Sequence, residues 1–161
     1  MLALIPIFAA AVFPPTITKS FSPPTVLVNQ VSTMTIVIDN PNTSDLTGAS
    51  MNDVFPPQLI NAGPVTTSCV GAFVALTPPP STLFFSGTIP ANGNCTITVP
   101  VFSATPGSFE NLTGNVFSTG PSSLVGGDAI LTVVTSIPTL SPMLLLLLAL
   151  VLAAVGARLT A

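Results

Sequence analysis

The chain contains no histidine, tryptophan or tyrosine, and charged residues make up only 4% of its 161 residues. Without histidine it lacks the usual general base, metal ligand and catalytic-triad member. Lys19 stands alone beside the first predicted strand, and the carboxylates are scattered among different predicted strands and turns. They are Asp39, Asp45, Asp53, Glu110 and Asp128. We therefore expect a protein that is not an enzyme and that carries no cofactor.

Basic residues are equally scarce, since Lys19 and Arg158 are the only two. Phosphate binding requires many basic groups, so nucleic acid is excluded as a partner. Serine, threonine and asparagine supply the polarity instead, which indicates a secreted or surface protein rather than an ordinary cytosolic one. Hydrophobic residues make up 48% of the chain, enough to build a core. The low charge leaves little repulsion between copies, so self-association is one expectation.

Short β-strands separated by proline, glycine and asparagine are the dominant pattern in the sequence. Residues 31–39 alternate with period two and place Met34, Ile36 and Ile38 on one face. Strands over residues 82–89 and 95–102 are predicted to form a hairpin, because the Asn-Gly pair between them readily takes positive φ. The other predicted strands cover residues 16–21, 46–54, 65–69, 71–76, 109–118 and 129–135, where 65–69 and 71–76 are either two short strands or one bulged strand. This pattern predicts an all-β fold, an immunoglobulin-like β-sandwich of about seven to nine strands, with a small barrel as the alternative.

Cys69 and Cys95 are the only cysteines. In an exported domain such a pair is expected to form one disulfide, and two buried free thiols are the alternative. A catalytic cysteine is not expected, because the chain has no histidine to serve as its base. The disulfide would close a loop of about 27 residues and stabilise the fold by roughly 3.5 kcal/mol through the entropy of the unfolded chain.

One turn between predicted strands gathers several oxygen donors. Asp39, Asn42 and Asp45 lie within seven consecutive residues, and Ca²⁺ prefers such ligands. The segment lacks the glycine and the closing glutamate of an EF-hand loop. A β-turn whose side chains bond their own backbone is therefore the favoured interpretation, with calcium as a weak alternative.

The stretch with the most biased composition is the unbroken apolar run over residues 143–156, which Arg158 follows. A helix over residues 143–161 would be about 28 Å long, close to the thickness of the hydrocarbon core of a membrane. Pro138 and Pro142 mark its start. Arg158 can reach the headgroups and stop the span with its end in the cytoplasm. We therefore expect a membrane-anchoring α-helix.

These features predict four segments. An apolar segment at residues 1–13 is a truncated signal peptide, the edge of a longer chain that has lost upstream domains, or a native first strand. The β-sandwich covers residues 14–135 and lies outside the cytoplasm. Residues 136–142 connect it to the membrane helix of residues 143–161.

The β-rich part resembles a family of bacterial surface repeats, the domain-of-unknown-function-eleven group. The resemblance rests on a strand that ends in an NPN turn, an LTG strand, and the segments SGTIPANGNCTITVPV and PGSFENLTGNV. It extends over nearly all of residues 14–134. It implies an immunoglobulin-like sandwich linked by Cys69 and Cys95, with a structural or adhesive role and no known catalysis.

The tail resembles the IPTL-type C-terminal sorting signal of Gram-negative bacteria. The matching residues are Ile137, Pro138, Thr139, Leu140 and Ser141, followed by the apolar run and an arginine. In that family an exosortase, a membrane-embedded cysteine transpeptidase, is thought to cut near the motif and to release or re-attach the protein. This chain departs from the pattern after the motif, where the Trp-Gly pair is missing and the basic cluster is reduced to Arg158.

Together these observations predict an exported, non-catalytic β-sandwich protein at the cell envelope, with a structural or adhesive role. Its expected partners are the membrane, an exosortase-type enzyme, further copies of itself, or a glycan or protein ligand at the surface. Two alternative functions are a carbohydrate-binding module and a filament subunit. In the second, an apolar segment such as residues 2–12 would complete a neighbour's sheet.

Overall fold

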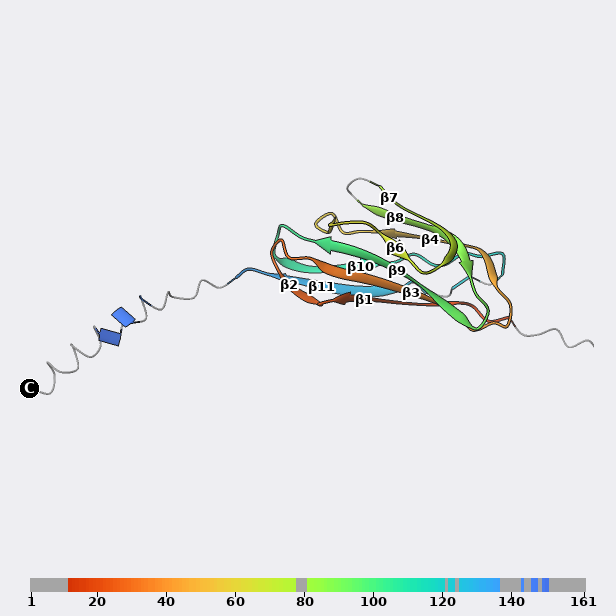
Figure 1. Cartoon of the computed structure of the whole chain (residues 1–161), viewed down its shortest axis with the longest axis horizontal. Helices are drawn as coiled ribbons and strands as arrows, with labels where there is room; N and C mark the ends of the chain where they lie inside the picture. Colours follow the sequence, from red (N-terminus) through yellow and green to blue (C-terminus); the bar gives the residue numbers. More distant parts are fainter. Residues whose placement is uncertain are drawn as a thin grey trace, which may run out of the picture.

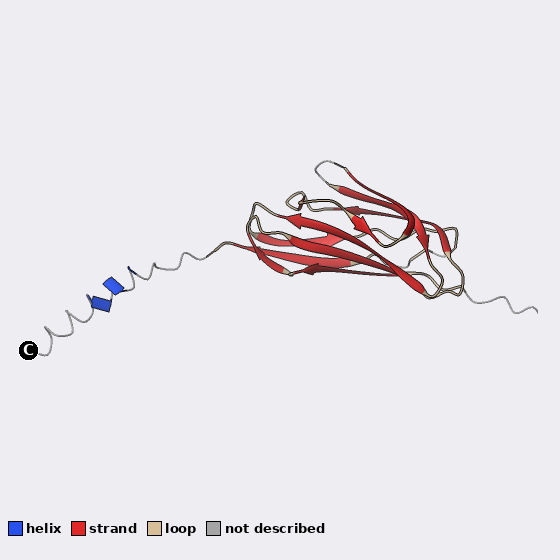
Figure 2. Cartoon of the chain, in the orientation of Figure 1, coloured by secondary structure: helices blue, strands red, loops and turns tan. Residues whose placement is uncertain are grey.

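The computed structural model describes residues 12–77, 81–120, 122–123 and 125–136, together with residues 143, 146, 147, 149 and 150 of the tail. Residues 12–136 form an all-β domain, as Figure 2 shows by its colouring. Its strands are β1 (Thr16–Ser22), β2 (Thr25–Leu27), β3 (Ser32–Asn40), β4 (Leu46–Val54), β5 (Ile60–Asn61), β6 (Thr66–Thr67), β7 (Val70–Leu76), β8 (Thr82–Ile89), β9 (Gly93–Phe102), β10 (Gly107–Leu112) and β11 (Asp128–Val134).

The strands form three sheets that pack as a β-sandwich. One sheet has the order β1-β3-β9, with both β5 and β6 paired to the far edge of β9. A second sheet, β4-β8-β7, lies above the first in the view of Figure 1. The third sheet, β10-β11-β2, contains the parallel pair of β11 and β2. The predicted immunoglobulin-like sandwich is confirmed, although short strands raise the number of strands above the predicted range.

Strand β3 is the centre of the core. Its residues alternate between the two faces, and Met34, Ile36 and Ile38 are completely buried, as the period-two pattern predicts. On the neighbouring β9, Ile97 and Val99 are also completely buried and lie opposite Ile36 and Met34. Each such side chain stabilises the fold by roughly 1.5–3 kcal/mol relative to exposure in water.

The predicted hairpin of residues 82–89 and 95–102 is wrong, because β8 and β9 belong to different sheets. The turn chemistry is present, since Asn92 takes a φ of 48°. However, the backbone N–H of Asn92 donates to the carbonyl oxygen of Asn42 (2.7 Å), and that of Ala91 donates to Asp45 Oδ1 (2.8 Å). These bonds attach the turn to another loop, so the chain crosses between sheets instead of folding back on β8.

Most other strand limits differ from the predictions by one or two residues, and the larger differences occur where strands are short or irregular. The predicted strands over residues 46–54 and 82–89 are confirmed to the residue. The short strands β2 and β5 had no predicted counterpart, and the strand predicted over residues 65–69 is reduced to β6. The strand predicted over residues 109–118 ends at Leu112, and beyond it only Thr113 and Phe117 form isolated bridges to β4. Strands of two or three residues are too short for periodicity to reveal them.

The predicted disulfide is present and joins Cys69 to Cys95. Cys69 lies between β6, which belongs to the first sheet, and β7, which belongs to the second. Cys95 lies on β9 of the first sheet and is completely buried. The bond therefore fixes the chain at the point where it passes from one layer of the sandwich to the other.

Several predictions concern residues outside the described part of the chain. These are most of the apolar segment 1–13, the motif residues 137–141 and most of the predicted helix 143–161, including Arg158. The five described residues of the tail are helical and exposed. Among the described residues, no helix is both long and apolar enough to span a membrane. The anchoring helix and the sorting motif therefore stay predictions.

Removing the disulfide should destabilise the domain without changing its fold. We expect the Cys69→Ser/Cys95→Ser variant to lose roughly 3.5 kcal/mol of unfolding free energy, because the unfolded chain regains the entropy of an open loop. Urea unfolding followed by circular dichroism measures the difference. Adding reductant should lower the stability of the wild-type protein by a similar amount and leave the double variant unchanged. Equal stability of the two proteins in oxidising buffer would contradict this account.

Candidate functional site

A cluster of polar side chains lies inside the sandwich, where three strands from three different sheets meet. Lys19 occupies an inward position of β1, between the buried Ile17 and Phe21. Asp53 is an inward residue of β4, and Asn111 is an inward residue of β10. Each strand therefore places one polar group where its alternation calls for an apolar one. Such groups are costly to bury unless they are bonded to one another.

The cluster is built around one carboxylate oxygen. The Lys19 ammonium Nζ donates to Asp53 Oδ2 at 2.7 Å and to Thr113 Oγ1 at 2.8 Å. The amide Nδ2 of Asn111 also donates to Asp53 Oδ2, at 3.3 Å, and lies 3.1 Å from the sulfur of Met34. The side chains of Lys19 and Asp53 have no solvent exposure. An amine, a carboxyl group and a carboxamide therefore share one dry site.

Two glycines allow the chain to pass closely over this cluster. A Cβ atom on Gly126 would lie 1.7 Å from the carbonyl oxygen of Thr113, and one on Gly127 would lie 3.3 Å from Cβ of Lys19. The backbone N–H of Thr113 donates to the carbonyl oxygen of Gly127 at 2.8 Å. Only glycine permits so close an approach, so these residues hold the segment before β11 against the cluster.

Burial favours the neutral forms of Lys19 and Asp53 more than water would. Burial lowers the pKa of the Lys19 amine, and the nearby carboxylates of Asp53 and Asp128 oppose that shift only in part. Burial likewise raises the pKa of Asp53, against the opposing effect of Lys19 and Asn111. Two buried oxygens, Asp53 Oδ1 and Asn111 Oδ1, have no hydrogen-bond partner among the residues that the structure describes. Buried polar atoms without a protein partner are unusual in a protein core.

The sequence prediction missed this cluster. It treated Lys19 as isolated and Asp53 as one of several scattered carboxylates. The available signal was the alternation of β1, because Lys19 has the same parity as Ile17 and Phe21 and must point inward with them. Nothing in the sequence shows that β4 and β10 bring Asp53 and Asn111 to the same place, since this depends on packing between sheets.

The weak calcium candidate is a hydrogen-bonded turn in the structure. Asn42 Oδ1 accepts from the backbone N–H of Phe13 at 2.7 Å, and the backbone N–H of Asn42 donates to Asn40 Oδ1 at 3.0 Å. Asp45 Oδ1 accepts a hydrogen bond from the backbone N–H of Ala91, and Asp39 is exposed on β3. No group of three histidine, cysteine, aspartate or glutamate residues that could hold a metal occurs in the described part of the chain. The side chains of Asn42 and Asp45 thus serve the turn.

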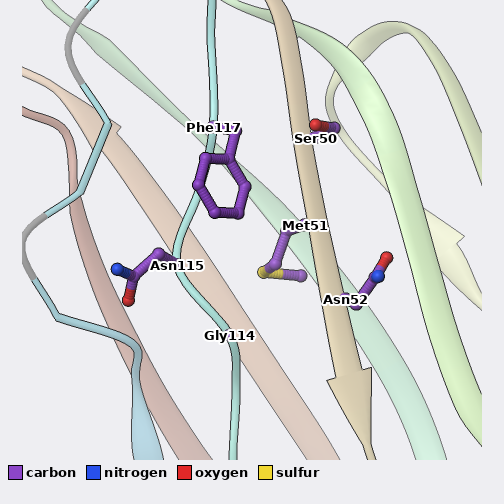
Figure 3. A pocket seen from close by; sticks show the side chains of 6 residues that line it. All are labelled: Ser50, Met51, Asn52, Gly114, Asn115 and Phe117. Atoms are coloured by element: carbon purple, nitrogen blue, oxygen red, sulfur yellow. The ribbon is translucent and has the colours of Figure 1, made fainter.

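A surface hollow of about 370 Å³ lies beside β4 and is shown in Figure 3. It lies between β4 and the segment that follows β10, which pair through two backbone hydrogen bonds between Ser50 and Phe117, of 2.7 and 2.9 Å. Phe117 is 60% exposed. The lining contains no charged residue and consists of Ser50, Met51, Asn52, Gly114, Asn115 and Phe117. Such a lining suits contact with another molecule better than bond-making chemistry.

The sequence matches one family model over residues 15–133, described as Domain of unknown function (DUF7933). The chain belongs to this family. No curated protein matches it in sequence. The match begins one residue before β1 and ends within β11, so it includes every strand of the domain. The resemblance to the domain-of-unknown-function-eleven group stays a prediction.

Solved structures share the fold of this DUF7933 domain at low sequence identity. A cohesin module of a family 33 glycoside hydrolase from Clostridium perfringens has a TM-score of 0.57 and 13% identity, and the match covers 79% of this chain and all of that one. A non-cellulosomal cohesin from Archaeoglobus fulgidus has a TM-score of 0.56 and 11% identity, covering 76% of this chain and 93% of that one. The major pilin SpaD of Corynebacterium diphtheriae has a TM-score of 0.54 and 13% identity, covering 72% of this chain and 34% of that one. These similarities establish the fold alone.

Replacing the buried lysine should destabilise the DUF7933 domain strongly. We expect Lys19→Met to cost about 3–5 kcal/mol of unfolding free energy, because it leaves the Asp53 carboxylate buried without a cation. Chemical denaturation measures the loss. Thr18→Met, at the adjacent exposed position of β1, is the matched control and should change stability by only about 0.5 kcal/mol. Equal stability of the two variants would show that Lys19 does not compensate the carboxylate.

Proposed function

We propose that this protein is an exported, non-catalytic module of the cell envelope with a structural or adhesive role. The observation that carries the proposal is the disulfide between Cys69 and Cys95, which bridges the two layers of an all-β sandwich. Disulfides persist in oxidising compartments outside the cytoplasm and are rare within it. The near absence of charged residues supports the same location, since a cytosolic surface normally carries many more.

The fold supports a role in binding or assembly rather than in catalysis. Cohesin modules and a major pilin share the architecture, which is compatible with a domain that contacts other proteins. The hollow beside β4 offers an apolar, uncharged surface for such a contact, and the exposed ring of Phe117 is its most prominent apolar group. Exposed aromatic side chains next to a hollow are typical anchors of protein interfaces.

The cellular location of the protein is proposed from the tail. The IPTL-type motif, residues 137–141, and the following apolar run would insert into the membrane, and an exosortase-type enzyme would then process the chain. The strands end at Val134, so the motif would follow the folded domain after a very short linker. Residues 135 and 136, which follow the last strand, are exposed, and such a position is accessible to a processing enzyme.

The two alternative functions stay predictions. Strand donation would use residues 2–12, which lie almost entirely outside the described part of the chain. Carbohydrate binding would have to proceed without tryptophan or tyrosine.

The proposed location and processing can be tested by intact mass spectrometry. The protein is isolated from the envelope of the cells that make it. We expect the protein in the envelope fraction, with a C-terminus within residues 136–142, because processing would remove the apolar tail. A matched variant with Pro138→Ala and Thr139→Ala should keep the tail through Ala161.

The remaining outcomes separate the parts of the proposal. An envelope protein that keeps Ala161 in the wild type would replace processing by a permanent anchor. Recovery of the wild-type protein in the cytosolic fraction with both cysteines reduced would overturn export and the envelope role.

A further inference from the structure

The buried cluster contains the reactants of an amide exchange. The Lys19 amine and the Asn111 carboxamide are both hydrogen-bonded to the same oxygen, Asp53 Oδ2, at 2.7 and 3.3 Å. All three groups are buried, so water does not compete for them. Effective concentrations of groups held in this way exceed any that solution can offer. An ion pair alone would not require the carboxamide to contact the same oxygen.

The environment prepares each group for reaction. Burial lowers the pKa of Lys19 and raises that of Asp53, which favours a neutral amine beside a carboxylic acid. A neutral, desolvated lysine is a nucleophile, and a carboxylic acid can donate a proton to a developing oxyanion. Protonation of Asp53 would also provide a hydrogen for the two oxygens that lack partners, Asp53 Oδ1 and Asn111 Oδ1.

We infer that Lys19 and Asn111 become joined by an intramolecular amide bond, with Asp53 as the proton carrier. The neutral amine of Lys19 attacks Cγ of Asn111, while the acid form of Asp53 protonates the carboxamide as the tetrahedral intermediate forms. The Asp53 carboxylate then removes a proton from the attacking nitrogen and returns one to the leaving nitrogen. The bond from Cγ to Nδ2 breaks and ammonia leaves, while the Asp53 carboxylate takes back the proton that it gave to the carboxamide oxygen. The Lys19–Asn111 amide and neutral Asp53 remain. No oxidant, metal or cofactor takes part.

The alternative electrophile is Asp53 itself, which contacts Lys19 more closely than Asn111 does. A Lys19–Asp53 amide would release water and would consume the carboxyl group that carries the proton. No second carboxylate is hydrogen-bonded to the Lys19 amine or to the Asn111 amide in the described part of the chain. The unpartnered Oδ1 of Asn111 is free to receive charge in the transition state. Asn111 is therefore the electrophile that leaves Asp53 in place as the proton carrier.

The bond would join two sheets of the sandwich covalently. β1 belongs to the first sheet and β10 to the third, and the two residues lie far apart along the chain. Together with the disulfide, it would prevent the sandwich from extending fully under load. This consequence does not depend on export or on the sorting signal.

The presence of a single lysine makes the test direct. The full chain is purified, denatured with its disulfide reduced, and analysed by intact mass and by fragmentation of a chymotryptic digest. The N- and C-terminal residues of the purified chain are determined, and the mass of that sequence is calculated. We expect the measured mass to be lower than the calculated mass by one ammonia. We also expect the digest to contain a cross-linked peptide with Lys19 and Asn111. An amine-reactive ester added to the denatured chain should leave Lys19 unlabelled.

Matched variants assign the roles. Asp53→Asn and Asn111→Ala should each yield a chain without mass loss and with Lys19 labelled. Asn52→Ala, an exposed asparagine beside Asp53 on β4, should keep the cross-link. Because the decisive reading is the mass of the wild-type chain, a variant that fails to fold leaves the test intact. An unmodified wild-type mass with labelled Lys19, or a loss of water located at Lys19 and Asp53, would overturn the inference.

Discussion

The contact of Lys19 with Asp53 is the constraint on which the arrangement of the three sheets depends. Both side chains are fully removed from solvent, and a buried charge is tolerated only when its partner is in place. The partner comes from a different sheet, and Asn111 comes from the third. A shift of β4 by two residues would keep its apolar side chains inward but would move Asp53 away from Lys19 and leave Lys19 alone in the core. The cluster thus selects one register among those that the apolar residues would accept.

The covalent link between Cys69 and Cys95 complements this selection. The cluster of Lys19, Asp53 and Asn111 acts where β1, β4 and β10 meet, whereas the disulfide acts where the chain passes from β6 to β7. The buried cluster specifies how the sheets are aligned. The disulfide limits how far the chain can separate when it unfolds. The two features therefore act at different places in the sandwich. Its apolar hollow beside β4, with the exposed Phe117, is available for a partner.

The parts of the fold that sequence could predict are those that depend on neighbours in the chain. The burial of Met34, Ile36 and Ile38 follows from the alternation of side chains along one strand, and the limits of β4 and β8 follow from proline and asparagine at their ends. The pairing of cysteines needed only the fact that there are two. The short strands β2 and β5 escaped prediction because two or three residues carry no measurable period.

The amino-acid sequence by itself determined the class of the protein: an all-β domain with one possible disulfide, almost no charge and no histidine. These properties are compositional or local, so they can be seen without knowing which strands are neighbours. Only the tertiary structure decided that β8 pairs with β4 and β7 rather than with β9, and that Lys19, Asp53 and Asn111 meet. Strand pairing and inter-sheet contacts join residues that are distant in the chain, and their energies depend on the whole packed core. For that reason the tail predicts where the protein works, while the chemistry inside the sandwich became visible only once the sheets were assembled.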